Sequence, residues 1–423
     1  MDLRKIVLSE LNSLVELYKH FHANPELSGQ EKETSRVLAD QLENCGIDVT
    51  RNVGGFGIVG TLENGDGPTV MIRTDMDALP VTENSGAEYA STIQAVDGSG
   101  NSVGVMHACG HDLHMAAFVG AAKTLSKLKN SWSGRILFVG QPAEEPMSGA
   151  RAMIDDGLFQ KFGRPDYCIG THVRPKVKAG TIAVRPGPVM AGVFQLKILV
   201  RGIGGHGSAP HETRDPVVLA ARIISSIQTI VSRELNPLTP AVVTIGSIHG
   251  GTRSNIIPEK VVMELTARFF DSETRDHILR SIKRICRNEA LTMDFPENLF
   301  PVITMEKDDE LPATINDNDL SAIVKAAVEE HLGKDHFVEA DMVMGSEDFA
   351  LYRTSASTEI PCCMFFTGVT SSSDMELYET QLINPPNLHN SGFLPQYENS
   401  ILAAVITMTA TVLNYQTSSK PRL

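Results

Sequence analysis

Apolar residues in the first 190 positions alternate between helical spacing and short continuous runs. Helical spacing covers residues 6–21 and ends before Pro25, and it returns at residues 37–42 before Gly46. The segment Ser28-Gly29-Gln30-Glu31 fits a capping box, which predicts that the second of these helices opens there. Continuous apolar runs predict buried strands at 58–62, 70–73, 135–139 and 167–171. Helices that alternate with buried strands indicate an α/β fold.

From Phe194 the pattern changes to strict alternation of apolar and polar residues, which is typical of a sheet with one wet face. A helix follows, with Asp215 as its N-cap and Pro216 as its first residue. The order β-α-β-β-α-β, that of the ferredoxin-like split unit, is completed by strands at 241–248, 261–270 and 300–304 and by a helix at 278–285. We therefore predict an inserted second domain over residues 191–306.

The last part of the chain returns to the pattern of the first part. A helix at 320–332 stops at Gly333, the run 362–366 predicts a buried strand, and a final helix passes through 401–412. Residues 1–190 and 307–423 are thus expected to form one discontinuous domain, and a chain of 423 residues is long enough for two domains. The expected fold class is α/β: a mixed-sheet α/β/α domain interrupted by the ferredoxin-like insert.

Composition excludes some classes of partner. The net charge is -14 and no basic run could follow a phosphate backbone, so we expect neither nucleic acid nor an anionic membrane as a partner. The first twenty residues mix charged and apolar positions, which argues against a signal peptide or a membrane span and favours a cytoplasmic location. The six cysteines are scattered over the whole length and are interpreted as reduced thiols.

The segment 106–115 concentrates metal-binding chemistry. Between His107 and His114, eight consecutive residues carry one thiol, three imidazoles and one carboxylate. These are the side chains that bind borderline-soft divalent metals, and Cys109 and His111 are two apart and would point the same way from an extended backbone. Two alternatives remain open here: a Cys109 nucleophile with a histidine base, or loop histidines around a small buried cysteine. The helix after this segment has Asp112 as its candidate N-cap.

Polar side chains also follow the predicted strands. Asp75 and Asp77 come after the strand 70–73, and Glu144 and Glu145 come after the strand 135–139, while His172 ends the strand 167–171. Alone, the two aspartates could make a turn and the two glutamates could be a solvated pair. Since α/β proteins keep their sites beyond the carboxyl ends of strands, these residues become candidates for one site.

Taken together, the segments resemble the metal-dependent amidohydrolase and metallopeptidase family that holds hippurate hydrolase, the N-acyl-amino-acid and indole-acetyl-amino-acid hydrolases and thermostable carboxypeptidase. The motifs that carry the resemblance run in order through nearly the whole chain: Asp75-Met76-Asp77-Ala78-Leu79-Pro80, His107-Ala108-Cys109-Gly110-His111-Asp112, Gln141-Pro142-Ala143-Glu144-Glu145, Thr171-His172, Gly205-His206, Asn255-Ile256-Ile257-Pro258, Gly345-Ser346-Glu347-Asp348-Phe349 and His389.

The resemblance implies a metal site. One or two divalent ions would be held by Cys109, His111, Glu145, His172 and His389. Glu144 would be the general base acting on a metal-bound water. Asp75, Asp77 and Asp112 would support the ligands, which leaves His107 and His114 as structural residues. Mixed thiol, imidazole and carboxylate ligation suits zinc, with manganese, cobalt or nickel as alternatives.

The resemblance also assigns roles to the insert. Its sheet edge would pair to make a homodimer or a higher oligomer, and the glycine-flanked His206 would stabilise a tetrahedral oxyanion. Asn255 would hold the carboxylate or carbonyl of the substrate. Two positions depart from the usual pattern: Arg253, which is either a carboxylate clamp or a surface residue, and the loop after His389, which reads Asn-Ser-Gly instead of Ser-Pro.

The expected activity is metal-dependent hydrolysis of the amide bond of N-acyl-L-amino acids, with small molecules as substrates. A dipeptidase or carboxypeptidase would use the same site and differ only in the acyl pocket. Enzymes with a Cys109 nucleophile are a third alternative. A binding homologue without turnover is the alternative from another class, and Glu144 argues against it because a binding protein has no need of a base beside its ligands.

Overall fold

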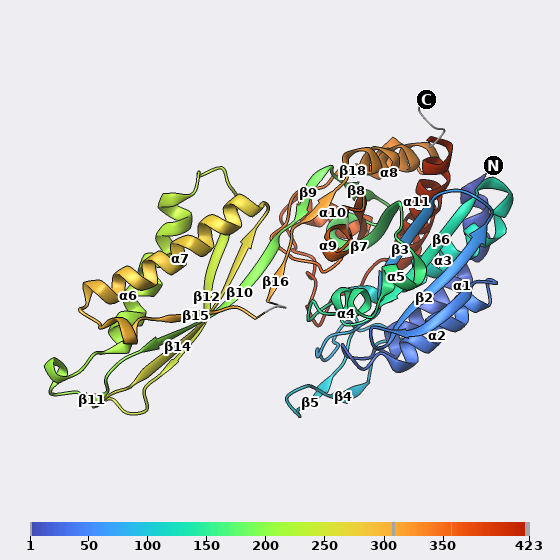
Figure 1. Cartoon of the computed structure of the whole chain (residues 1–423). Helices are drawn as coiled ribbons and strands as arrows, with labels where there is room; N and C mark the ends of the chain where they lie inside the picture. Colours follow the sequence, from blue (N-terminus) through green and yellow to red (C-terminus); the bar gives the residue numbers. More distant parts are fainter. Residues whose placement is uncertain (1, 307–308, 357, 419–423) are drawn as a thin grey trace. The chain divides into compact units, whose positions relative to one another are not determined.

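The computed structural model describes residues 2–306, 309–356 and 358–418, and their contacts divide the chain into two compact units (Figure 1). The first unit is Met1–Val189, Ile315–Asp341 and Asp348–Leu423, and the second is Met190–Thr314 and Met342–Glu347. Each unit has a hydrophobic core of its own. No helix in the described ranges is both long enough and apolar enough to span a membrane.

The first unit is built on an eight-stranded mixed sheet with the order β1-β2-β6-β3-β7-β19-β8-β18. Its strands are β1 Asp48–Val53, β2 Gly57–Asn64, β3 Thr69–Asp75, β6 Gly134–Gln141, β7 Tyr167–Lys178, β8 Ile182–Val184, β18 Phe337–Glu339 and β19 Cys362–Thr370. Because β3 pairs in parallel with both β6 and β7, the carboxyl ends of these strands meet at one edge. Two short ribbons accompany the sheet: β4 Gln94–Val96 with β5 Ser102–Gly104, and β9 Gly187–Met190 with β17 Thr314–Asn316.

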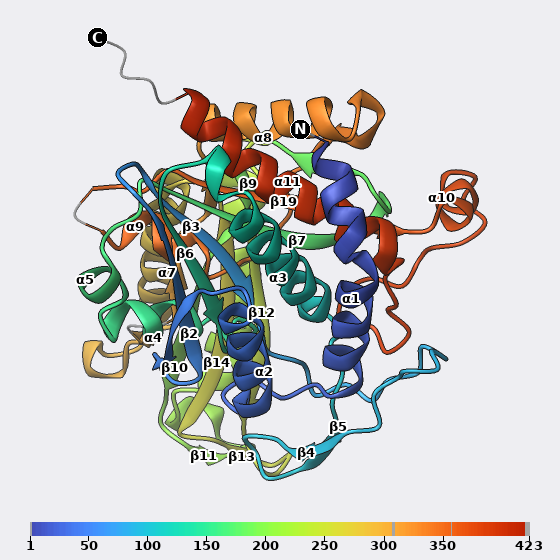
Figure 2. The ribbon, with the colours of Figure 1, turned by 90° about the vertical axis from the view of Figure 1, so that its right-hand side faces the viewer.

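Helices cover both faces of this sheet. They are α1 Leu3–Ala23, α2 Lys32–Glu43, α3 His111–Lys127, α4 Gly149–Asp155, α5 Leu158–Phe162, α8 Asn318–His331, α9 Ala350–Thr354, α10 Ser372–Glu379 and α11 Tyr397–Ser418. Figure 2 shows α1, α3 and α11 together, and with α8 they share the main core. The two faces are evident on β7: Ile169 belongs to that core, whereas a Cβ at Gly170 would lie 3.1 Å from the ring of Phe349 on the opposite side.

Two cap predictions are wrong, in each case because a distant partner takes the capping side chain. The start of α2 is capped by the Glu26 carboxylate, not by the predicted box. The Ser28 hydroxyl instead donates to Asp77, and Glu31 accepts from the amide of Ala143.

Asp112 was predicted as the N-cap of its helix, but α3 begins at His111 and its N-cap is Gly110. Asp112 lies in the first turn of α3, where its carboxylate faces His22 at 2.6 Å. Gly110 has a φ of 79°, and a Cβ there would lie 2.5 Å from Val173. Glycine therefore allows α3 to start directly against β7.

The second unit confirms the ferredoxin-like part of the predicted fold class. Its strands are β10 Gly192–Arg201, β11 Gly205–His206, β12 Val242–Gly250, β13 Ile256–Ile257, β14 Lys260–Phe269, β15 Val302–Thr304 and β16 Glu310–Leu311, and its helices are α6 Pro216–Thr229 and α7 Ser272–Thr292. The sheet order β12-β14-β10-β15 is that of a split βαβ fold, and β16 pairs with β10. As predicted, Asp215 caps α6 by accepting from the amide of Val217.

Short 3-10 and π turns complete the described elements: Lys129–Ser131, Pro210–Glu212, Ile230–Glu234, Glu297–Leu299 and Lys334–His336.

Candidate metal centre and catalytic residues

Side chains of metal-binding type converge at the edge where the strands of the first unit end. Cys109, His111 and His172 bring one sulfur and two nitrogens within 4.8 Å of one another, and Cys109 Sγ lies 3.5 Å from His172 Nε2. Cys109 also groups within the same limit with Glu145 and His389. The structure therefore brings together the five residues predicted as metal ligands.

The five side chains come from separate segments that the backbone holds together. His172 lies on β7, two residues beyond the last one that pairs with β3, and His111 opens α3. Glu145 follows β6. His389 lies in the loop before α11, and its amide donates to the carbonyl of Ala108 at 2.8 Å. This bond ties the late histidine to the segment that carries Cys109.

Hydrogen bonds to one ring nitrogen orient both buried histidines. His111 Nδ1 lies 2.8 Å from the carbonyl oxygen of Asp77, and His172 Nδ1 lies 2.8 Å from the carbonyl oxygen of Val173. A carbonyl only accepts, so each Nδ1 carries the proton and donates it. In the neutral ring this leaves Nε2 of each histidine with a lone pair that faces the cluster.

The cluster fits a divalent metal ion. Two of its buried atoms, His111 Nε2 and Glu145 Oε1, have no hydrogen-bond partner among the residues that the structure describes. A buried polar atom without a partner costs about 1–3 kcal/mol. A cation bound by both atoms would remove this cost, and thiolate, imidazole and carboxylate together are a donor set for zinc-like metals.

The charge around His111 supports the same conclusion. Four carboxylates lie within 4 Å of its ring nitrogens, those of Asp75, Asp77, Glu144 and Glu145. Burial opposes a charge on His111, but the carboxylates of Asp75 and Asp77 outweigh it and raise its pKa to about 10. At Glu145 burial acts in the other direction and raises the pKa of the carboxyl group to about 7. Without a metal, His111 and Glu145 therefore tend to hold protons, and a bound divalent cation would replace these protons.

Comparison with known proteins identifies the family. A family model described as Peptidase family M20/M25/M40 matches residues 71–381, which include every residue of the cluster except His389. The chain belongs to this family.

Relatives of this chain in the M20 family include hydrolases of several amides. Thermostable carboxypeptidase 2 of Saccharolobus solfataricus is 36% identical over 86% of this chain and 88% of its own length. N-acetyl-L-cysteine deacetylase of Bacillus subtilis is 34% identical over 85% of this chain and 81% of its own length. The solved structure of the YXEP protein of Bacillus subtilis, described as a dinuclear metal-binding peptidase of the M20 family, is 28% identical with a TM-score of 0.77 and covers 96% of this chain and 99% of its own. The protein is accordingly a hydrolase that acts on amide bonds.

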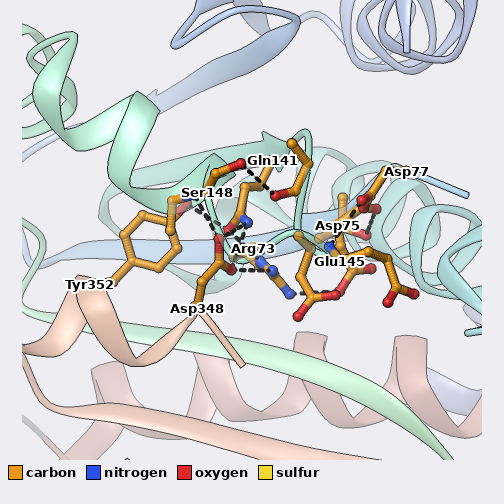
Figure 3. A network of polar contacts seen from close by, with 12 residues as sticks. Arg73, Asp75, Asp77, Gln141, Glu145, Ser148, Asp348 and Tyr352 are labelled. Carbon is orange, nitrogen blue, oxygen red and sulfur yellow. Dashed lines mark hydrogen bonds and ion pairs between the residues drawn. The ribbon is translucent and has the colours of Figure 1, made fainter. Parts of the chain in front are cut away.

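In this M20 chain a buried polar network supports the cluster (Figure 3). Arg73 is fully buried in β3 and donates to Asp75 at 2.6 Å, to Gln141 at 2.9 Å and to Asp348 at 3.3 Å. Asp348 also accepts from Gln141 Nε2 at 2.7 Å and from the amide of Ala150 at 2.9 Å. The network thus fixes both ends of the loop that carries the two glutamates.

No role for Arg73 or Asp348 was predicted from the sequence, although both lie in segments that carry predicted elements or motifs. A signal for Arg73 was present, because an arginine within an apolar strand must find buried partners. No comparable signal identifies Asp348, whose partner Arg73 lies 275 positions away along the chain.

Asp75 and Asp77 lie directly beside the cluster. Asp75 is 2.7 Å from His114 Nδ1, and His114 Nε2 accepts from the amide of Val173 at 2.8 Å. His114 therefore connects the end of β3 to β7 at the residue next to His172. Asp77 accepts from the amide of Glu145 at 3.0 Å.

Two other residues of the segment 106–115 lie apart from these supports. Asp112 faces His22 instead of the cluster. His107 is buried, and neither of its ring nitrogens has a hydrogen-bond partner within the described part of the chain.

The three remaining predicted residues belong to the second unit. The ribbon of β11 and β13 places His206 near Asn255, because the amide of Gly207 donates to the Asn255 carbonyl at 2.8 Å. His206 Nδ1 accepts from the Ser208 hydroxyl at 2.7 Å. The side chains of His206, Arg253 and Asn255 are all exposed. The structure therefore brings His206 and Asn255 together on one ribbon of that unit.

Proposed function

We propose that the protein hydrolyses the amide bond of N-acyl-L-amino acids. One observation carries the proposal: adjacent glutamates after β6 face the same cluster differently. Glu145 faces two proposed ligands, with Oε2 3.4 Å from His389 Nε2 and Oε1 4.0 Å from His111 Nε2, whereas Glu144 Oε2 faces His111 Nε2 at 3.8 Å. We assign Glu145 to the ligands, with Cys109, His111, His172 and His389, and Glu144 to proton transfer.

A divalent ion held by these residues would supply Lewis acidity, which polarises a carbonyl and makes water nucleophilic at neutral pH. Glu144 takes a proton from the attacking water and passes it to the leaving nitrogen. Asp77 holds the Glu145 amide and the His111 ring in place. Zinc is the metal we propose, with manganese, cobalt or nickel as alternatives, because the donor set suits all four.

For the second unit we propose roles in binding substrate and in dimerisation. His206 would stabilise the oxyanion and Asn255 would hold a substrate carbonyl or carboxylate, since both side chains are exposed on one glycine-rich ribbon. Arg253 is proposed as a further substrate contact. The sheet of this unit would pair in a homodimer through β12. All six cysteines are free thiols, which fits the reducing cytoplasm that we propose as the location.

Two other functions would use the same residues. A carboxypeptidase or dipeptidase activity is supported by the likeness to thermostable carboxypeptidase 2. A Cys109 nucleophile is less well supported, because burial raises the pKa of its thiol well above the ordinary value and the thiolate is the nucleophile.

The test is hydrolysis of an N-acyl-amino acid panel and a dipeptide panel, with metal analysis of the purified protein before and after chelation. We expect Glu144→Gln to keep its metal and to lose kcat by about 10²- to 10⁴-fold, since it removes the general base. The matched control is Glu63→Gln, an exposed glutamate of β2, which should leave kcat unchanged. Metal-free protein with chelator-insensitive cleavage would contradict the proposal, and full activity of Glu144→Gln would remove Glu144 as the base.

A further inference from the structure

Arg174 lies two residues beyond the proposed metal ligand His172 on the same strand. The parallel pairing of β7 with β19 is regular here, with His172 opposite Phe366 and Arg174 opposite Gly368. Side chains two apart on a regular strand point to the same face, with their Cα atoms about 6.6 Å apart. Arg174 therefore extends from the face of β7 that carries His172.

The guanidinium of Arg174 is held against an aromatic ring but is poorly satisfied. Its central carbon lies 4.9 Å from the ring centre of Phe366, a side chain that is itself buried. Its hydrogen bond from an Nη to the carbonyl of Asp341 is long, at 3.4 Å. Arg174 is half-buried, and within the described ranges no carboxylate lies within ion-pair distance of it, although the charge of Asp341 acts on it from beyond that distance.

In this respect Arg174 differs from Arg73 and Arg353, two arginines of the first unit that are ion-paired. Arg73 pairs with two buried carboxylates, and Arg353 pairs with Glu359 at 2.7 Å. A guanidinium has five N–H donors, and stacking on an aromatic ring leaves their planar edge available. That edge matches the two oxygens of a carboxylate.

A carboxylate on the substrate would need such a cation. Glu144 and Glu145 lie in the same site and repel an anionic substrate, and the whole chain has a net charge of -14. A fixed guanidinium beside His172 offsets this repulsion locally and orients the substrate along β7.

We propose that Arg174 is a specificity-determining residue that binds a carboxylate of the amide substrate. The inference rests on the proposed amide hydrolysis and adds to it the residue that recognises a free carboxylate of the substrate. That carboxylate belongs either to the amino acid or to the far end of a dicarboxylic acyl group. The two sources share the chemistry that Arg174 recognises, and they are separated by experiment.

The experiment compares wild type with Arg174→Met, which keeps an unbranched side chain and removes the charge, and with Arg174→Lys. The control is Arg185→Met, because Arg185 is also half-buried and donates at 3.4 Å to the neighbouring carbonyl of Ala340. Two substrate pairs are used: an N-acetyl-amino acid against its α-carboxamide, and an N-succinyl-amino acid amide against its succinyl methyl ester.

We expect wild type to prefer the acid in one of the two pairs, and that pair identifies the source of the carboxylate. Arg174→Met should lose the preference by a rise in KM of about 10- to 100-fold for the acid, with kcat and the neutral partner little changed. Arg174→Lys should keep part of the preference for the acid, because lysine retains the positive charge but lacks the planar edge of the guanidinium. Arg185→Met should behave as wild type.

Binding of the same four compounds to Glu144→Gln protein, measured by calorimetry, separates the two proposals. Loss of acid binding in Glu144→Gln/Arg174→Met supports the role of Arg174 even where turnover is absent. Equal preference for the acid with and without Arg174 overturns that role and leaves the proposed hydrolysis standing. Absence of any acid preference in protein that retains Arg174 overturns it as well.

Discussion

Arg73 is the residue on which the support of the site depends. Its side chain is fully buried, and it joins Asp75, which faces His114, to Asp348, which holds the loop after Glu145. Burial removes the hydration of a charge, so such a residue is stable only while its partners remain. Arg73 in turn supplies positive charge to both carboxylates, and at Asp75 this adds to the charge of His111 and His114.

Replacing Arg73 should therefore destabilise the protein strongly. Arg73→Met removes a buried guanidinium from Asp75 and Asp348, and breaking a buried ion pair costs about 3–5 kcal/mol. Urea denaturation measures the loss. The matched control is Arg36→Met, whose arginine pairs with Glu33 and Asp40 on an exposed helix surface and should matter little. Equal stability of the two variants would contradict a supporting role for the network.

For single residues, the sequence predicts which side chains could bind a metal better than it predicts which residues contact one another. The thiol, imidazole and carboxylate of Cys109, His111 and Glu145 make a metal site a candidate from the residue types, and the resemblance to a family then favours it over a cysteine nucleophile. The partner of Asp348 is not recoverable in this way, because an acidic residue in a loop is ordinary and its arginine is far away in the chain.

At the scale of elements, the end of α1 meets the start of α3 through a buried ion pair. His22, in the last turn of α1, lies 2.6 Å from Asp112 in the first turn of α3 and 2.9 Å from Glu83. A cation at a helix C-terminus and an anion at a helix N-terminus both interact favourably with the helix dipoles. Tyr18 and Tyr89 are the other titratable groups packed against the ring.

This pair makes stability depend on pH. Burial opposes the charge on His22, but Asp112 and Glu83 outweigh it and raise its pKa to about 9. An imidazole whose pKa is higher in the folded state stabilises the fold fully below its unfolded pKa of about 6.5. The contribution, roughly 3 kcal/mol, is lost as the pH rises through 9. The phenol of Tyr89 stays neutral over this range, because burial raises its pKa to about 12.

The measurement is the stability difference between wild type and His22→Gln at pH 6, 7.5 and 9. Glutamine keeps hydrogen-bonding capacity but cannot take the proton, so the difference should be largest at pH 6 and should shrink toward pH 9. His211→Gln serves as control, because His211 is exposed. A difference that is constant or that grows with pH would contradict the ionic role of His22.

Element boundaries show why local patterns mislead at such a site. The Ser28-to-Glu31 pattern fits a capping box, and Asp112 fits an N-cap, yet Ser28 binds Asp77 and Asp112 binds His22. In both segments a tertiary partner takes the side chain that the local pattern assigns to a cap. Asp215 caps its helix as predicted, since it lies near the surface of the second unit, where it has no such competing partner among the residues described.

At the scale of the whole molecule, the alternation of polarity was enough to predict the fold class. The order β-α-β-β-α-β follows from the sequence, and the sheet of the second unit has it. The order of strands in the large sheet was not predictable, because β19 comes from the end of the chain and pairs with β7 through contacts between distant residues. Short strands such as β8 and β18 also lack a pattern long enough to be noticed.

The edge of the second sheet bears on assembly. β12 has nine residues, pairs with β14 and has no second neighbour among the described strands. Natural edge strands are usually protected by charges or proline. β12 contains neither, and Ile248 on it is 48% exposed. β12 is interrupted by one register shift between Ile245 and Ser247, and the rest of this edge is suited to pairing with the same strand of a second copy.

We therefore expect a dimer that charges on β12 disrupt. In a variant with Thr244→Lys and Ile248→Lys, pairing of the two edges would bring four lysines together, and like charges on facing strands repel. Sedimentation equilibrium should give twice the chain mass of 45.9 kDa for wild type and a single chain for the variant. Val302→Lys, an exposed position on the opposite edge strand β15, is the control and should remain a dimer.

A dimeric double-lysine variant, or a monomeric wild type at micromolar concentration, would contradict assembly through β12. Hydrolysis by the monomeric variant then decides whether the proposed site works within one chain or requires its partner.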